Sequence, residues 1–342
     1  MKNCVALILS IFIFSHSLSA QIDTLLLPYD ATSLTAEQQA SNPSVLAYPT
    51  ALRDKIPDMK CKNTFTIDAE GHMVAFSKGN LQYNPSTNSW RFAENQWSFI
   101  GSGDCGNVYE NGSKCDNENV MQINYSGWLD LFAWGTSNWV RPNGEFYWPT
   151  SWENSTANAD KYHICGNGLN NLEGAYANAD WGIYNQIGPY PPNTWHTLSK
   201  AQWNYIIYIR ANSENLCGFG IVNGIHGCIL LPDNWQNIAG IVFYPSRTYS
   251  IENEYSLGEW NAMEENGAIF LPKAGNRQGN EVDECNHIGF YWTTTAAESY
   301  FINNSQKYYT AACCFRFQNS LEFTEGERRW GFAIRLVRDI GN

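Results

Sequence analysis

Basic residues are scarce in this sequence. Its 342 residues include 21 Lys and Arg against 33 Asp and Glu, which gives a formal net charge of −12 at pH 7. Apart from the adjacent Arg328 and Arg329, the basic residues are scattered along the chain. A phosphate-binding surface needs clustered Lys and Arg. The composition therefore argues against nucleic acid as a partner.

Long hydrophobic runs are also missing after the first residues, so we expect no membrane span. The one early run, Val5–Phe14, is too short to cross a bilayer; Lys2 precedes it, and the small residues Ser19 and Ala20 follow. This is the pattern of a cleavable secretory signal peptide. We expect residues 1–20 to be removed by cleavage near Ala20, which leaves 20 basic and 33 acidic residues in a protein that is secreted, periplasmic or at the cell surface.

The common catalytic motifs are absent from the sequence. It has no His-Glu-x-x-His, no Gly-x-Ser-x-Gly, no Cys-x-x-Cys and no phosphate-binding glycine-rich loop with Lys. His226 and Cys228 share a strand face at positions i and i+2, about 6.6 Å apart along an extended chain. We interpret Cys228 as a buried or disulfide-bonded residue, and Cys165 near His163 in the same way. No catalytic residue is assigned.

Nine cysteines remain after the expected cleavage, and in an oxidising compartment they are expected to form disulfides. The odd count leaves one thiol free or paired with another chain. Cys105 and Cys115, which bracket a Gly- and Asn-rich loop, are the best local pair. Cys313 and Cys314 are adjacent, so on a strand they point to opposite faces and favour two separate bridges over one vicinal bridge.

The chain divides into three parts. After the signal peptide, residues 21–62 are rich in proline and small polar residues, which is typical of a flexible leader or stalk. Residues 63–342 are expected to form one domain. Its first strands are predicted at 64–67 and 73–76, flanking a turn at Glu70 and Gly71. Further strands are predicted at 79–83, 90–92, 227–232, 240–243, 268–272, 289–292 and 331–337.

Two helices carry start signals. Ser199 with Gln202, and Ser256 with Glu259, each form the Ser-x-x-Gln/Glu pattern of a capping box. Gly267 is placed to end the second helix. A shorter helix is predicted over 127–134. Few helices among many short strands predict an α+β fold.

Several segments resemble a known family. They are Phe76–Tyr83 (FSKGNLQY), Trp90–Gln96 (WRFAENQ), Gly127–Ser137 (GWLDLFAWGTS), Asp180–Gly182 (DWG), Leu230–Trp235 (LLPDNW) and Gly289–Thr295 (GFYWTTT). In these segments the chain resembles secreted Bacteroidetes surface proteins described by the Fibrobacter succinogenes major paralogous domain. The closing Gly331–Arg338 (GFAIRLVR) is similar to the terminal strand of the C-type-lectin-like fold, as used by formylglycine-generating enzymes (sulfatase-modifying factors) and retroelement variable proteins.

The resemblance covers residues 64 to 339 and implies a C-type-lectin-like fold. Such a fold has short antiparallel sheets, two or three helices and long irregular loops, and its first and last strands pair. The enzyme members bind copper through two cysteines a few residues apart. The late pair here, Cys313 and Cys314, is adjacent and diverges on a strand, so the catalytic residues of that family do not carry over.

The resemblance to the variable proteins implies a ligand-binding face near the C-terminal strands. There, rigid aromatic rings lie beside adaptable hydrogen-bonding groups, a mixture suited to recognition. The residues expected to bind ligand are Trp292, Thr294, Tyr300, Tyr308, Tyr309 and Arg316.

No metal site is assigned, although one acidic segment offers oxygen ligands. Glu281, Asp283 and Glu284 lie in a Gly- and Asn-rich loop and are the candidate calcium ligands, but they lack EF-hand spacing. No other cofactor is expected.

Three functions remain open. The favoured one is a non-catalytic secreted or cell-surface protein that recognises a protein or glycan through its C-terminal face. The alternatives are an extracellular enzyme of formylglycine-generating or glycan-processing type, and a structural subunit of a cell-surface assembly joined through the odd cysteine or a sheet edge.

Overall fold

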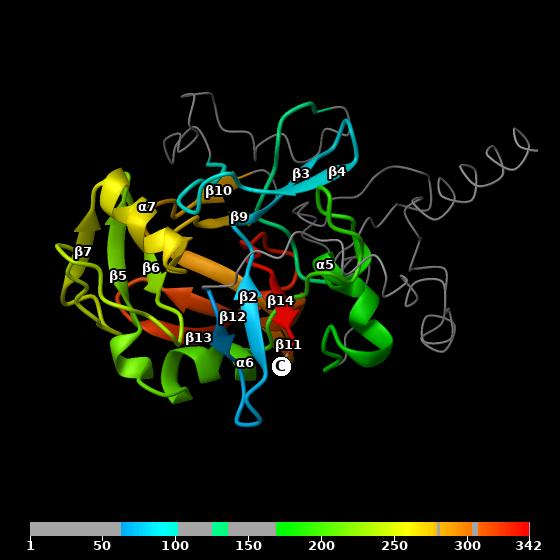
Figure 1. Ribbon diagram of the computed structural model, residues 1–342. Coiled ribbons are helices and arrows are strands. Elements are labelled where there is room, and N and C mark those ends of the chain that lie inside the picture. The colour runs from blue at the N-terminus through cyan, green and yellow to red at the C-terminus, as the bar shows by residue number, and fades with distance from the viewer. Residues whose placement is uncertain (1–62, 102–124, 136–168, 279–280, 303–306, 342) are drawn as a thin grey trace, which may run out of the picture.

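The computed structural model describes residues 63–101, 125–135, 169–278, 281–302 and 307–341. The expected signal peptide and leader lie outside these ranges, as do Cys105 and Cys115. The described chain is a mixed α+β structure with mostly short antiparallel sheets and few helices (Figure 1). Within the described ranges, no helix is long and apolar enough to cross a membrane.

The last strand of the described chain pairs with its second strand. Strands β1 (Phe65–Thr66), β2 (Met73–Phe76) and β14 (Val337–Ile340) form one sheet in the order β1-β2-β14. Val337 lies opposite Phe76 and Ile340 opposite Met73, so the end of the chain is antiparallel to its beginning (Figure 1). Gly71 has a φ of 86°, the left-handed conformation that the predicted turn requires.

The segment 125–135 is not the short helix that the sequence predicts. It lies beside the hairpin of β3 (Leu81–Asn84) and β4 (Ser89–Phe92), and Leu129 bridges to Tyr83 in β3. Phe132 bridges to Phe332. The backbone groups that a helix would use internally are therefore bonded to distant segments, and burial of both side chains favours this arrangement over helix propensity.

A four-stranded sheet forms the other half of the molecule (Figure 1). Its strands are β5 (Cys217–Val222), β6 (Ile225–Leu230), β7 (Glu252–Tyr255) and β8 (Ile269–Pro272), in the order β7-β5-β6-β8. Only the β5–β7 pair is parallel. The strand predicted at 240–243 is wrong: these residues belong to the irregular connection between β6 and β7, which we call the β6–β7 loop (231–251).

Both predicted capping boxes are present. Ser199 begins α6 (Lys200–Asn204), which continues as a π-helical turn, η5 (Tyr205–Ile209). Ser256 begins α7 (Leu257–Glu265), and Gly267, with a φ of 93°, follows its end. In each box the serine oxygen accepts from the backbone three residues on, and that residue's side chain accepts from the serine N–H. The remaining short helices are η4 (Gly174–Ala179), α5 (Trp181–Tyr184) and η6 (Ser213–Asn215).

The remaining strands form one three-stranded sheet and one two-stranded sheet. Strands β11 (Gly289–Ile302), β12 (Lys307–Phe317) and β13 (Leu321–Glu327) form a three-stranded sheet, and β9 (Asn276–Gln278) pairs with β10 (Glu281–Asp283). The predicted strand 331–337 is regular only from Val337 onward, because residues 331–333 make isolated bridges to three different segments.

Two large apolar clusters make up the core. One lies around the four-stranded sheet and α6, where the ring of Trp203 stacks on Phe315 at 5.1 Å between centroids. The other is rich in tryptophan and fills the space between the β3–β4 hairpin, α5 and β11. Most of the tryptophans in the described ranges therefore contribute to packing, as expected for large aromatic side chains.

Candidate functional site

The four-stranded sheet carries a polar cluster on one face. The strand register aligns Phe219 in β5 with Glu252 in β7, and Ile221 with His226 in β6. Lys273, directly after β8, donates its backbone N–H to the carbonyl of His226. Because side chains alternate along strands and cross-strand neighbours share a face, Glu252, His226 and Lys273 lie on the same side of the sheet.

Glu252 is the centre of this cluster. Its carboxylate contacts Nδ1 of His226 at 2.7 Å and accepts a hydrogen bond from the hydroxyl of Tyr249 at 2.5 Å. The hydrogen bond to Glu252 raises the pKa of Tyr249 to about 12, with partial burial adding to the effect. Glu252 thus fixes the orientation of both an imidazole and a phenol. We call Glu252, His226, Tyr249 and Lys273 the Tyr249 cluster.

The side chain of Lys273 packs against the ring of Tyr249. Its side-chain nitrogen lies 4.8 Å from the ring centroid of Tyr249 and 5.6 Å from that of Phe219, and it donates to the carbonyl of Gln318. Burial lowers the pKa of this lysine, although the charge of Glu252 acts in the opposite direction. The ring of Tyr249 also meets Phe219 edge to face at 5.5 Å. Tyr249 is therefore held by contacts to its hydroxyl and to its ring.

The part of the β6–β7 loop that carries Tyr249 is pinned at both ends. Asn253 donates to the carbonyl of Tyr244 and accepts from its N–H. The N–H of Tyr249 donates to the carbonyl of Asn319 at 2.7 Å, and Leu321 donates to the carbonyl of Arg247 at 3.0 Å. The turn between β12 and β13 thus braces this loop, so its exposed side chains project from a fixed backbone.

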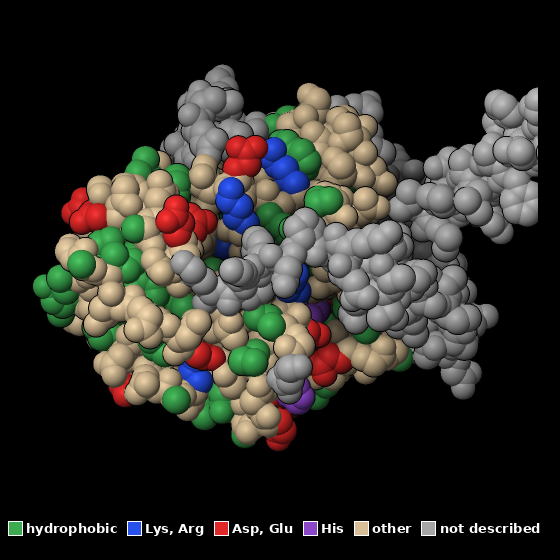
Figure 2. Space-filling view, viewed as in Figure 1, with side chains coloured by type: hydrophobic (Ala, Val, Ile, Leu, Met, Phe, Trp, Pro, Cys, Tyr) green, Lys and Arg blue, Asp and Glu red, His purple; other side chains and the backbone are tan. Residues whose placement is uncertain are grey.

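Exposed apolar side chains gather on the same segment. Among the described residues, half of the large hydrophobic side chains that face solvent belong to the β6–β7 loop: Val242, Tyr244, Tyr249 and Ile251. The others are Leu257 in α7, Tyr208, Ile209 and Leu169. In the left part of Figure 2, over β5, β6 and β7, apolar side chains appear as separate green areas among polar ones.

Two residues expected on the C-terminal ligand face lie in the interior instead. Trp292 is 1% exposed; its indole donates to the carbonyl of Phe132 at 2.8 Å, and its ring packs on Phe332. Thr294 is 3% exposed, and its hydroxyl donates to Glu173. The expectation that these two side chains face a ligand is corrected: tertiary contacts from segments far away in sequence cover this stretch of β11.

Arg316 is partly exposed but already has partners. Its guanidinium pairs with Glu322, its cross-strand neighbour, and donates to Gln318. A ligand would compete with both groups for this side chain.

The three tyrosines of the predicted face lie on the distal parts of β11 and β12. The backbone of Tyr300 pairs with that of Tyr309, and Phe301 pairs with Tyr308. Their side chains fall outside the described part of the structure, so their membership of a ligand face stays a prediction.

The described cysteines are thiols within the core. Burial raises the pKa of Cys228 well above its ordinary value and also raises that of Cys217. A buried thiol with a raised pKa is a poor nucleophile. The imidazole of His226 is bonded to Glu252, which agrees with the interpretation of Cys228 as a buried residue.

Cys313 and Cys314 point to opposite faces of β12, as predicted. Cys314 packs in the tryptophan-rich cluster, whereas Cys313 packs against Ala297 and Ala311. Both are free thiols in the structure. Cys61, Cys105, Cys115 and Cys165 lie outside the described residues, so the predicted bridges to other parts of the chain stay predictions.

The calcium candidates do not converge where their side chains are described. Asp283 accepts from the N–H of Glu284, and the carboxylate of Glu284 faces the exposed His287 at 3.7 Å. The side chain of Glu281 is outside the described part. Calcium binding at these residues therefore stays untested.

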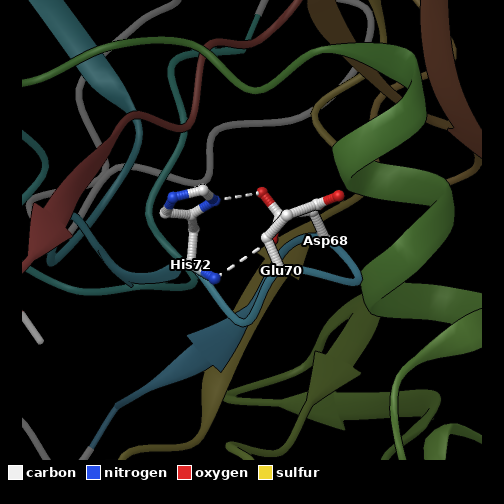
Figure 3. Close-up of side chains that lie close together, drawn as sticks. All are labelled: Asp68, Glu70 and His72. Carbon is white, nitrogen blue, oxygen red and sulfur yellow. Dashed lines mark hydrogen bonds and ion pairs between the residues drawn. The ribbon is translucent and has the colours of Figure 1, made fainter.

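One group of potential metal ligands does come together among the described residues, at the turn between β1 and β2 (Figure 3). It consists of Asp68, Glu70 and His72, with ligand atoms within 4.8 Å of one another. Asp68 accepts from both the backbone N–H and Nδ1 of His72, at 3.0 and 2.7 Å. These bonds close the turn and hold His72 against Asp68 without a metal ion, and Glu70 lies on the same turn.

Sequence reasoning identified only His226 in the Tyr249 cluster. Glu252 in β7 and Lys273 directly after β8 are far from His226 in sequence, and no spacing rule connects them. One signal was present: residues 244–250 (YPSRTYS) combine Tyr with Ser and Thr between two strands, a composition used in recognition loops.

Comparison of the chain with protein-family models, with curated proteins and with solved structures gave no match in any of the three. The resemblance to the Fibrobacter succinogenes major paralogous domain thus depends on the quoted sequence segments alone.

Proposed function

We propose that this chain is a secreted or cell-surface binding protein that recognises a protein or glycan ligand without transforming it. The single observation that carries the proposal is the braced β6–β7 loop, which presents exposed tyrosines next to the Tyr249 cluster. Tyrosines lose little conformational entropy on binding and offer both an apolar ring and a polar hydroxyl. Bracing before the ligand arrives lowers the cost of binding further.

The proposal moves the recognition surface away from the predicted C-terminal face. On that face, Trp292 and Thr294 are buried, and Arg316 forms an ion pair with Glu322. The β6–β7 loop still touches the C-terminal strands, because Tyr249 and Arg247 bond to the turn between β12 and β13. The β6–β7 loop therefore lies beside the end of that face that carries Arg316, whereas Tyr300, Tyr308 and Tyr309 lie toward the other end of β11 and β12.

A C-type-lectin-like fold is part of the same proposal. The resemblance implies that the first and last strands pair; the last strand, β14, pairs with β2 in the sheet that also contains the first strand, β1, so strands from both ends of the domain share one sheet. The mixture of short sheets with few helices is compatible with it. Export to the cell surface rests on the signal-peptide pattern of residues 1–20.

The test is a binding screen with the purified secreted chain. The labelled protein is applied to a glycan array and to a panel of surface proteins, together with Tyr244→Ala and Tyr249→Ala variants. We expect saturable binding that both substitutions reduce by about tenfold or more. Leu169→Ala is the matched control, because Leu169 is exposed and lies outside the β6–β7 loop. Absence of saturable binding in both panels would reject the proposal.

A further inference from the structure

The Tyr249 cluster has a feature that the proposed function does not specify: one aromatic ring is framed by fixed polar groups. Tyr249 is 42% exposed although three contacts hold it, from Glu252 at the hydroxyl and from Phe219 and Lys273 at the ring. The supporting lysine and phenylalanine lie on the protein side. The exposed part of a ring held in this way is a rigid, flat apolar surface.

Hydrogen-bonding groups surround the exposed part of the Tyr249 ring. The carboxylate of Glu252 lies at its hydroxyl edge and orients the partly exposed His226, which leaves Nε2 of the imidazole directed away from that carboxylate. Along the chain, Tyr249 is flanked by the exposed Thr248 and Ser250. The hydroxyl of Ser246 lies 3.1 Å from that of Ser250 and donates to the carbonyl of Thr248, so this hydroxyl-rich stretch is ordered internally.

This arrangement matches the chemistry of a sugar ring. A pyranose has an apolar face of C–H groups, and its hydroxyls radiate from the edge as donors and acceptors. A single flat aromatic ring bordered by carboxylate, imidazole and hydroxyl groups offers the complementary pattern, with few polar groups placed to fix orientation. A protein hot spot instead buries an aromatic anchor inside a surrounding apolar contact, whereas both chain neighbours of Tyr249, Thr248 and Ser250, are polar and exposed.

The net negative charge of the chain favours uncharged sugars over anionic sugars as ligands. The chain has a formal net charge of −12, and the charged side chains visible over β7 and α7 in the upper left of Figure 2 are acidic. Such a potential repels sulfated or uronic-acid polymers. Within the cluster, the single carboxylate of Glu252 is balanced by Lys273. No excess of positive charge is present there to attract an anion.

We infer that the Tyr249 cluster is a subsite for an uncharged glycan, in which the sugar ring stacks on Tyr249 and its hydroxyls bond to Glu252 and His226. The inference rests on the proposed binding function and names the ligand class for that same surface. It requires no metal ion, because every group that it uses belongs to the protein.

The experiment uses isothermal titration calorimetry with the full secreted chain. The probes are neutral hexasaccharides of the cello-, xylo-, manno-, malto- and chito- series, with heparin and polygalacturonate fragments as anionic probes. We expect at least one neutral probe to bind in the presence of EDTA and both anionic probes to fail. Tyr249→Ala should weaken that binding by about tenfold or more, while Tyr249→Phe, which keeps the ring, should weaken it less.

Control variants separate stacking from misfolding and from the broader proposal. Leu169→Ala removes an exposed apolar side chain outside the β6–β7 loop, and it should leave the oligosaccharide affinity within about twofold. Glu252→Gln should weaken sugar binding while thermal unfolding confirms that the variant is folded. Binding only to anionic probes, or equal losses in Leu169→Ala and Tyr249→Ala, would overturn the inference.

The two proposals fail in different ways. If no neutral oligosaccharide binds but a protein from the surface panel binds through the β6–β7 loop, the glycan subsite is wrong and the binding function stands. If neither oligosaccharides nor proteins bind, both are wrong.

Discussion

The guanidinium of Arg335 donates from Nη2 to the main-chain oxygen of Phe270 at 2.7 Å, deep inside the molecule. It also donates to Asn80 and to the carbonyls of Ser77 and Lys78. Arg335 therefore joins the last segment of the chain to β8 and to the connection between β2 and β3. Burial lowers its pKa to about 10, which still leaves the side chain charged at neutral pH.

Replacing Arg335 with Met should destabilise the fold by about 3 kcal/mol or more, because several buried oxygens lose a charged donor. Arg335→Lys should recover only part of this loss, since an ammonium group cannot reproduce the forked geometry. Urea unfolding measures both. Lys78→Met is the control at an exposed neighbouring site and should change stability by less than about 0.5 kcal/mol. A urea unfolding midpoint for Arg335→Met equal to that of the wild type would contradict the structure.

Two glycines at the second position of a helix should respond oppositely to the same substitution. A Cβ atom on Gly182 in α5 would lie 2.3 Å from the carbonyl oxygen of Trp195, whereas one on Gly258 in α7 would meet nothing within 4 Å. Gly182→Ala should destabilise the protein by about 2 kcal/mol through overpacking. Gly258→Ala should be neutral or stabilising by up to about 1 kcal/mol. If the packing around Gly182 were wrong, thermal unfolding would show equal effects for Gly182→Ala and Gly258→Ala.

The pairing of His196 with Asp339 should make stability depend on pH. Burial alone would lower the pKa of His196, but the hydrogen bond and charge of Asp339 outweigh it, so the pKa is raised above 6.5. A raised folded-state pKa means that protonation stabilises the fold fully below about pH 6.5 and that this contribution is lost as the pH rises through the raised value.

Because Asp339 is 75% exposed, we expect the loss between pH 6 and pH 8.5 to be under about 1 kcal/mol. Asp339→Asn should flatten the dependence over this interval, as measured by denaturant unfolding at both pH values. An unchanged slope in that variant would assign the dependence to other groups.

Cys313 and Cys314 should not form a disulfide with each other, because their side chains leave β12 on opposite faces. Peptide mapping of the secreted, unreduced protein should show each cysteine either free or joined to a distant one. Rapid alkylation of the native protein should spare Cys314, whose pKa burial raises, until the chain is unfolded. A peptide that contains a Cys313–Cys314 bridge would contradict this arrangement.

Local signals in the sequence predicted local structure well. Ser199 and Ser256 begin helices because a capping box needs only residues three positions apart, and Gly71 and Gly267 adopt positive φ because only their own turns require it. The failures share one cause. Residues 127–134 and 240–243 have helical and strand patterns, but partners outside each segment, such as Phe332 for the first and Tyr255 for the second, determine their conformations.

Composition and neighbouring residues are enough to predict the acidic charge, the signal-peptide pattern, the α+β class and the divergence of Cys313 and Cys314. The burial of Trp292 depends instead on long-range contacts, and so does the meeting of Glu252, His226, Tyr249 and Lys273 on one sheet face. Those four residues come from β6, β7, the loop before β7 and the end of β8. Strand order and register bring them together, and both are set by long-range packing rather than by local spacing.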